Sequence, residues 1–115
     1  MKMKRIEATI QSNKIAVVSD AINDIVGGFT ILEGNGRGSG GRQTIRAGRG
    51  TGTIIAEYNK VAIVSTIVDD ADVEKVSTAI TDAVFTGKDG DGIIVVSNVD
   101  SVLNIASKKK DSEAL

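Results

Sequence analysis

Thr86-Gly87-Lys88-Asp89-Gly90-Asp91-Gly92 leads directly into the apolar run Ile93-Ile94-Val95-Val96. Three glycines within six residues, placed before a β-type run, predict a tight turn that opens into a strand. Backbone N–H groups exposed in such a turn form a concave anion site, and Lys88 adds a positive charge beside it. The turn is therefore either a plain connection or a phosphate-binding site, and its surroundings decide which.

Outward from this turn, the hydrophobic pattern predicts strands and helices in the order βαββαβ. Strand character is present at residues 5–10, 29–33, 53–58, 61–68 and 93–97. The segments 53–58 and 61–68 are either two strands or one long strand kinked near Asn59. Apolar residues at helical spacing mark two helices, Ile15, Val18, Ile22 and Ile25 in the first and Val73, Val76, Ile80 and Ala83 or Val84 in the second.

The ends of these helices carry signals of their own. Ser12 and Asn13 are candidate caps for the first helix, which the pair Gly27-Gly28 ends. Aspartates 69, 70 and 72 stand where the second helix begins, and the helix macrodipole favours negative charge there. A short helical turn is expected at residues 99–103.

This order predicts a single α+β domain over residues 1–115. The fold class is a ferredoxin-like βαββαβ sandwich, with an antiparallel sheet and two helices on one face. Residues 61–64 and 93–96 are apolar on both faces of their strands, which indicates that the second sheet face is covered as well. The chain has no spare element for this, so we expect other copies of the chain to cover it.

Composition excludes several classes of function. The chain has no cysteine and no histidine, which excludes a thiolate metal site, a disulfide scaffold and a Ser–His or Cys nucleophile. A formal net charge of −1 and only three aromatic residues argue against nucleic-acid binding. No apolar stretch approaches the roughly 20 residues of a membrane span, so we expect a cytoplasmic protein without membrane insertion. No general base stands out, and neither a catalytic nor a metal site is predicted.

The central segment 34–52 is glycine-rich and basic. It contains eight of the thirteen glycines, four of the five arginines and no acidic residue. Glycine maximises the entropy lost on ordering, so we expect a mobile loop. Arginine suits bidentate contact with phosphate or carboxylate. The loop either orders on an anionic ligand or a partner protein, or is a solvated hairpin whose charge keeps it soluble.

Three weaker features each have two interpretations, and a fourth has one. Asp69, Asp70 and Asp72 bind a divalent cation or serve as caps. Residues 108–110 are three lysines that reach a phosphate or form a solvated tail. Lys60 is a ligand lysine or a solvated strand end, and Glu33 is interpreted as structural.

Five segments together resemble the PII signal-transduction family. They are Met3-Lys4-Arg5-Ile6-Glu7-Ala8, Gly28-Phe29-Thr30, Glu33 with Gly36-x-Gly38, the turn Thr86-Gly87-Lys88-Asp89-Gly90-Asp91-Gly92, and the ending Asp111-Ser112-Glu113-Ala114-Leu115. The resemblance covers nearly the whole chain outside the loop, and the glycine turn is its most specific part.

The resemblance implies a homotrimer that binds adenine nucleotides in clefts between subunits. It places Gly28, Phe29 and Thr30 near the adenine and ribose, with Val64 and Thr66 lining the base pocket. It places the loop base and the turn near the phosphates, through Gly36, Arg37, Gly38, Thr86, Gly87, Lys88, Gly90, Asp91 and Gly92. The loop would then control a target protein, such as a transporter or a metabolic enzyme.

The chain also departs from the pattern of that family. Members that bind ATP with 2-oxoglutarate usually have a lysine after the glycine turn, where this chain has Ile93, and two arginines where it has Asn104 and Ala106. The loop glutamine and tyrosine of other members have no counterpart, and residues 39–41 read Ser-Gly-Gly. Loss of three cations weakens triphosphate binding, so ADP or AMP is expected in preference to ATP. Lys88, Arg37 and the lysines 108–110 would supply the positive charge.

Two alternatives keep the same fold. The site could take a cyclic nucleotide or bicarbonate in place of ADP, which ligand screening would distinguish. The chain could also be a metal-tolerance trimer of the CutA type, which the absence of histidine, cysteine and a metal-spaced carboxylate set disfavours.

Overall fold

The computed structural model describes the chain except residues 1, 39–41, 43 and 47–51. The strands are β1 (Met3–Gln11), β2 (Thr30–Gly36), β3 (Thr44–Arg46), β4 (Thr53–Ile55), β5 (Asn59–Asp69) and β6 (Ile93–Val99). The helices are α1 (Ile15–Ile22) and α2 (Val73–Val84), and the 3-10 turns are η1 (Ser12–Lys14), η2 (Asp70–Asp72) and η3 (Asp111–Ala114). In this part of the chain no helix has both the length and the apolar character needed to cross a membrane.

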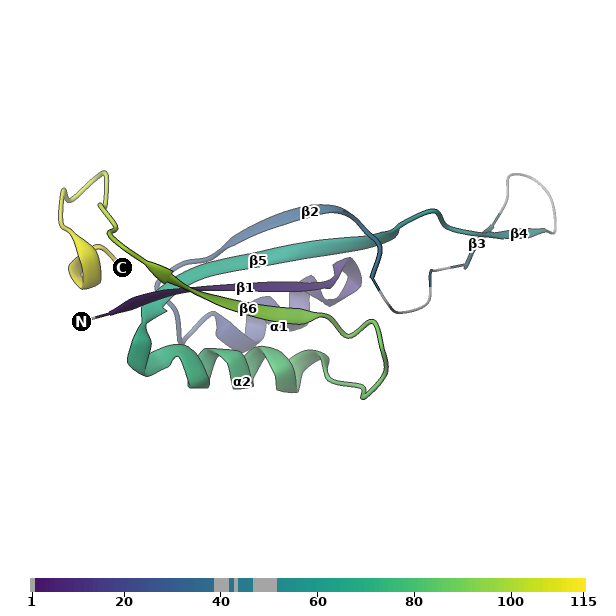
Figure 1. The fold of residues 1–115 in the computed structure, drawn as a ribbon, viewed down its shortest axis with the longest axis horizontal. Coiled ribbons are helices and arrows are strands. Elements are labelled where there is room, and N and C mark those ends of the chain that lie inside the picture. Colours follow the sequence, from purple (N-terminus) through teal and green to yellow (C-terminus); the bar gives the residue numbers. More distant parts are fainter. Residues whose placement is uncertain (1, 39–41, 43, 47–51) are drawn as a thin grey trace.

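Four of these strands form an antiparallel sheet in the order β2-β5-β1-β6, and both helices lie on the same face of it (Figure 1). The predicted α+β ferredoxin-like sandwich is therefore confirmed. The strands β3 and β4 pair only with each other and project from one end of the sheet as a separate hairpin.

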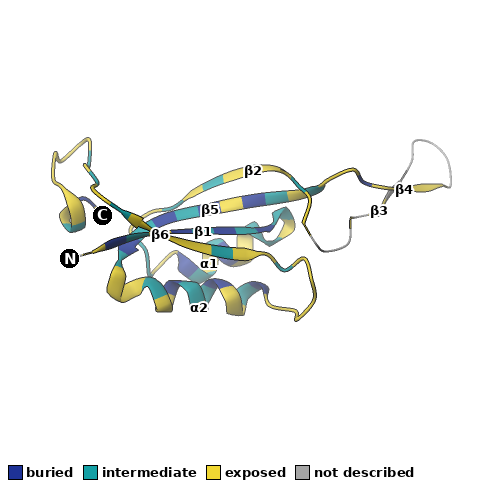
Figure 2. Ribbon diagram, viewed as in Figure 1, coloured by how far each residue is buried: buried dark blue, intermediate teal, exposed yellow. Residues whose placement is uncertain are grey.

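The hydrophobic core lies between the helices and one face of the sheet. Alternate residues of β1 point into it, and Ile6, Ala8 and Ile10 are almost fully buried. The same period-two rule brings Val64 of β5 to this face, opposite Ala8. The helices contribute Val18, Ile22, Val76, Ile80 and Val84, as their spacing predicted. Figure 2 shows burial concentrated on β1, β5 and the inner sides of the helices, whereas the edge strands β2 and β6 are mostly exposed.

The second face of the sheet carries a row of apolar side chains that this single chain leaves exposed. Leu32 stands opposite Ile63, Ile63 opposite Thr9, and Thr9 opposite Ile93. Leu32 and Ile93 are 63% and 64% exposed. This is the face on which the sequence predicts contact with other copies of the chain, and the oligomer stays a prediction.

Several local predictions were wrong at the element ends. Ser12 and Asn13 make no capping hydrogen bond and form the 3-10 turn that precedes α1. No helical turn occupies residues 99–103, because Leu103 pairs with Lys110 in a bridge and the turn of helix comes later, in η3. For segments 53–58 and 61–68, by contrast, the two-strand alternative is confirmed, since β4 pairs with β3 whereas β5 pairs with β1 and β2.

Truncation of the α2 core side chain Ile80→Ala is expected to lower the free energy of unfolding by about 2–5 kcal/mol. Ile80 is 1% exposed, so the substitution leaves a cavity that its neighbours fill only in part. Urea denaturation at fixed protein concentration measures the loss. Val17→Ala on the exposed side of α1 is the control, with an expected change below about 0.5 kcal/mol. Equal losses in the two variants would contradict this placement of the core.

Candidate functional site

The glycine turn connects the end of α2 to the start of β6. Its three glycines all adopt positive φ angles, with +82° at Gly87, +102° at Gly90 and +120° at Gly92. Residues other than glycine adopt such angles only with strain, which explains why the turn has glycine at these three positions.

Gly92 is required for a second reason, which is space. A Cβ atom at this position would lie 2.1 Å from the backbone oxygen of Thr9 in β1. The turn therefore rests directly on the end of the central strand, and no side chain fits between them. Directly after this contact, Thr9 and Ile93 form the first residue pair of the β1–β6 ladder.

Asp91 closes the turn from within. Its Oδ2 accepts the N–H of Thr86 at 2.7 Å and the N–H of Gly87 at 3.0 Å, and its Oδ1 accepts the Thr86 hydroxyl. These hydrogen bonds, from the Thr86 hydroxyl first and then from the two amides, lower the pKa of Asp91, with a further contribution from the charge of Lys14. The Asp91 carboxylate thus holds the two ends of the turn together.

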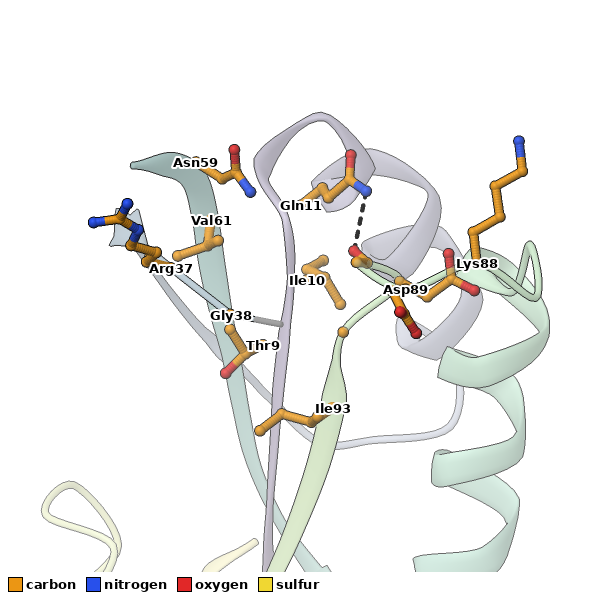
Figure 3. Close-up of a pocket in the computed structure, with 14 residues that line it drawn as sticks. Thr9, Ile10, Gln11, Arg37, Gly38, Asn59, Val61, Lys88, Asp89 and Ile93 are labelled. Atoms are coloured by element: carbon orange, nitrogen blue, oxygen red, sulfur yellow. Dashed lines mark hydrogen bonds between the residues drawn. The ribbon is translucent and has the colours of Figure 1, made fainter. Parts of the chain in front are cut away.

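A cavity of about 480 Å³ lies between the turn, the end of β1 and the base of the 34–52 segment (Figure 3). On one side Gln11 donates from Nε2 to the carbonyl oxygen of Gly90 at 3.0 Å. The residues that line the cavity are Thr9, Ile10, Gln11, Gly36, Arg37, Gly38, Asn59, Val61, Lys88, Asp89, Gly90, Asp91, Gly92 and Ile93. Half of them were predicted from the sequence, namely Gly36, Arg37, Gly38, Lys88, Gly90, Asp91 and Gly92.

The two cations of the cavity stand at its opposite edges. Arg37 forms an ion pair of 3.2 Å with Glu57, and both side chains are largely exposed. An exposed pair of this kind contributes only about 0.2–1 kcal/mol, so Glu57 holds Arg37 weakly. Lys88 projects from the turn on the other side of the cavity (Figure 3). Among the described residues the amides of Asp89 and Gly90 have no hydrogen-bond partner, so they are available to an anion.

Seven of the predicted residues do not line this cavity: Thr86 and Gly87, which Asp91 holds within the turn, and Gly28, Phe29, Thr30, Val64 and Thr66. Thr30, at the start of β2, is six residues from Gly36, which corresponds to about 20 Å along the strand. Gly28 comes two residues before Thr30, and its carbonyl oxygen accepts a hydrogen bond from the Thr66 hydroxyl at 2.6 Å. The side chains of Val64 and Thr66 are buried in the sheet face that the helices cover. Phe29 stands between Gly28 and Thr30 in the sequence, and the ligand role of all seven residues stays a prediction.

Sequence reasoning missed the contribution of β1. Thr9 and Ile10 were interpreted only as strand and Gln11 was given no role, yet the three form the floor of the cavity because Gly92 rests on this end of β1. No local signal marks Gln11 as part of the site. Asn59 and Val61 join it for the same reason, since β5 lies next to β1 in the sheet.

The weaker sequence features lie elsewhere. Lysines 108–110 belong to the C-terminal segment, at the end of the sheet opposite the glycine turn of the same chain (Figure 1). Asp69 accepts the hydroxyl of Ser112 at 2.8 Å, and the described residues contain no group of three acidic side chains arranged for a metal ion. Glu33 and Lys60 line a second cavity of about 310 Å³ with Ser12 and Asn35.

Asn104, one of the departures from the family pattern, is a structural residue of the C-terminal loop. Its Oδ1 accepts the N–H groups of Ala106 and Ser107, both at 3.0 Å, and its Nδ2 donates to the carbonyl of Ala114 at 3.2 Å. Residues 39–41, where relatives have the loop glutamine, lie outside the described residues.

Comparison with known proteins agrees with the resemblance carried by these motifs. Residues 3–109 match the family model described as nitrogen regulatory protein P-II. The nitrogen regulatory protein P-II of Synechocystis sp. is 37% identical over 114 residues, which cover 98% of this chain and 100% of that protein. The protein of the same name from Azospirillum brasilense is 33% identical with the same coverage. The chain therefore belongs to the P-II family, whose members are regulators and not enzymes.

Solved structures confirm the fold independently. The structure of GlnK from Bacillus subtilis matches with a TM-score of 0.77 at 20% identity, over 100% of both chains. The structure of the GlnK–ATP complex from the same organism matches with a TM-score of 0.76 at 22% identity, over 99% of this chain and 98% of that chain.

The substitution Asp91→Asn is expected to lower stability at neutral pH and to lose this effect in acid. The pKa of Asp91 is lower in the folded chain than in the unfolded chain, so its contribution is complete above the unfolded pKa of about 3.9 and is lost as pH falls through the folded pKa. Thermal unfolding of both proteins should therefore show a gap in midpoint at pH 7 that narrows below about pH 4. The exposed Asp100→Asn is the matched control, and a gap that persists in acid would contradict the assignment.

Proposed function

We propose that this P-II protein binds an adenine nucleotide at the glycine turn and controls a target protein through the segment 34–52. The observation that carries the proposal is the 480 Å³ cavity, in which a turn with three positive-φ glycines faces the base of that segment. The free amides of Asp89 and Gly90, with Lys88 beside them, suit a phosphate group. The matching fold of a GlnK–ATP complex supports adenine nucleotide as the ligand class.

The site is completed by a second copy of the chain. Thr30 lies about 20 Å along β2 from Gly36, and Gly28 and Phe29 come directly before Thr30, so one chain cannot bring these three residues to the same nucleotide as the turn. In a homotrimer, the adenine half-site of one subunit would meet the phosphate half-site of its neighbour. The exposed apolar row that includes Leu32 and Ile93 gives the subunits a surface to bury.

The nucleotide is ADP or AMP in preference to ATP. Ile93 lines the cavity and brings no charge, and Asn104 is committed to the C-terminal loop. Arg37 is shared with Glu57. Lys88 is therefore the one cation of the described cavity lining without an ion-pair partner, which suits a ligand with fewer phosphate charges.

Ligand binding reaches the target through the loop base. Gly36, Arg37 and Gly38 form one wall of the cavity and also begin the segment that leads to the β3–β4 hairpin. A nucleotide that contacts this wall fixes the conformation of the loop base, from which the rest of the segment extends. The target is a transporter or a metabolic enzyme that receives the segment 34–52.

Calorimetric titration with ADP, AMP and ATP tests this function. We expect binding with ADP or AMP tighter than ATP, and Lys88→Ala to weaken it about 10-fold by removing a charge-assisted contact. Lys75→Ala, an exposed lysine of α2, is the matched control and should bind as the wild type does. Gly90→Val should abolish binding without changing the oligomer in sedimentation, because a β-branched residue does not tolerate a φ of +102°.

Four results would overturn the proposal or its details. No binding of any adenine nucleotide at millimolar concentration would exclude the function, and binding of a cyclic nucleotide or bicarbonate in the same titration would replace the ligand. Tighter binding of ATP than ADP would contradict the preference. A monomer that binds ADP at full strength would exclude the shared site.

A further inference from the structure

Besides the contact of Gly92 with the Thr9 backbone, two side chains hold the glycine turn, one from within the turn and one from outside it. Internally, Asp91 holds Thr86 and Gly87. Externally, the described residues outside the turn give it one side-chain hydrogen bond, from Gln11 Nε2 to the Gly90 oxygen at 3.0 Å. The space around Gly90 is the most open of the three glycines, because a Cβ there would meet only this same Nε2, at 3.9 Å.

Gln11 stands where the two walls of the cavity meet. It is the last residue of β1, and its backbone pairs with Val61 of β5. The Val61 side chain in turn packs against Gly36, where an added Cβ would lie 3.2 Å from both methyl groups. The residue that holds the glycine turn is thus the strand neighbour of the residue that packs on the loop base.

We propose that Gln11 is a positioning residue that sets the glycine turn at its binding distance from the loop base. This inference rests on the proposed nucleotide function. Without the Gln11 hydrogen bond, a segment with three glycines samples many conformations. Ligand binding is then weakened by the conformational entropy lost when the segment is ordered. An amide suits the task because it donates to a carbonyl and brings no charge into a cavity that receives an anion.

The variants Gln11→Met and Gln11→Glu separate the donor from the shape of the side chain. Methionine keeps the length and loses the donor, and it should weaken ADP binding about 3- to 10-fold, the range of one neutral hydrogen bond. Glutamate is close to isosteric but places a carboxylate against the Gly90 carbonyl, so the loss should exceed 10-fold. Asn13→Leu, which removes an exposed amide from the neighbouring 3-10 turn, is the control and should leave binding unchanged.

Amide hydrogen exchange in the ligand-free protein provides the readout that a merely structural role would not move. In Gln11→Met, the Thr86 and Gly87 amides held by Asp91 should exchange faster, whereas the β1 amides and the thermal midpoint stay as in the wild type. Unchanged exchange at the turn, or ADP binding by Gln11→Glu equal to the wild type, would overturn the role of Gln11. Failure of the wild type to bind any nucleotide would instead remove the proposed function, and the exchange result would still decide whether Gln11 holds the turn.

Discussion

The contact on which the site depends is the approach of Gly92 to the Thr9 carbonyl. With only 2.1 Å between that oxygen and the place of a Cβ, the chain has to be glycine where it leaves the turn and enters β6. The contact seats the turn on β1, which lies between β5 and β6 in the middle of the sheet. The end of the turn at Gly92 cannot shift without the sheet, so the glycine-rich segment has a defined position where it enters β6.

The alternation of β1 then connects the fold to the site. Its even-numbered residues Ile6, Ala8 and Ile10 are buried against the helices, so Thr9 is turned toward the other face. That face carries the exposed Ile63 and Ile93, which flank Thr9 across the sheet. The surface expected to meet other subunits therefore runs directly into the cavity floor, and assembly and ligand binding share residues in the proposed function.

Sequence alone predicted what is local. Alternation predicted β1, continuous apolar runs predicted β5 and β6, helical spacing predicted the buried stripes of α1 and α2, and closely spaced glycines predicted the turn, because each of these signals depends on residues that are neighbours in the sequence. It could not predict Gln11, which meets Gly90 from 79 positions away, or the pairing of Arg37 with Glu57, since both depend on the register of the sheet. The capping prediction at Ser12 failed because residues 12–14 form a 3-10 turn in which no side-chain oxygen bonds the helix end.

The closure of the turn by Asp91 has a consequence for anion binding. Its carboxylate accepts the Thr86 and Gly87 amides and adds negative charge at the cavity. Other groups therefore have to supply the positive charge that attracts a phosphate. Lys88 supplies part of it, and Arg37 is the other candidate. Since the exposed pair of Arg37 with Glu57 is worth at most about 1 kcal/mol, a phosphate can take Arg37 from Glu57 at low cost. Such an exchange would release Glu57, which stands between β4 and β5, and would thereby link ligand binding to the base of the hairpin.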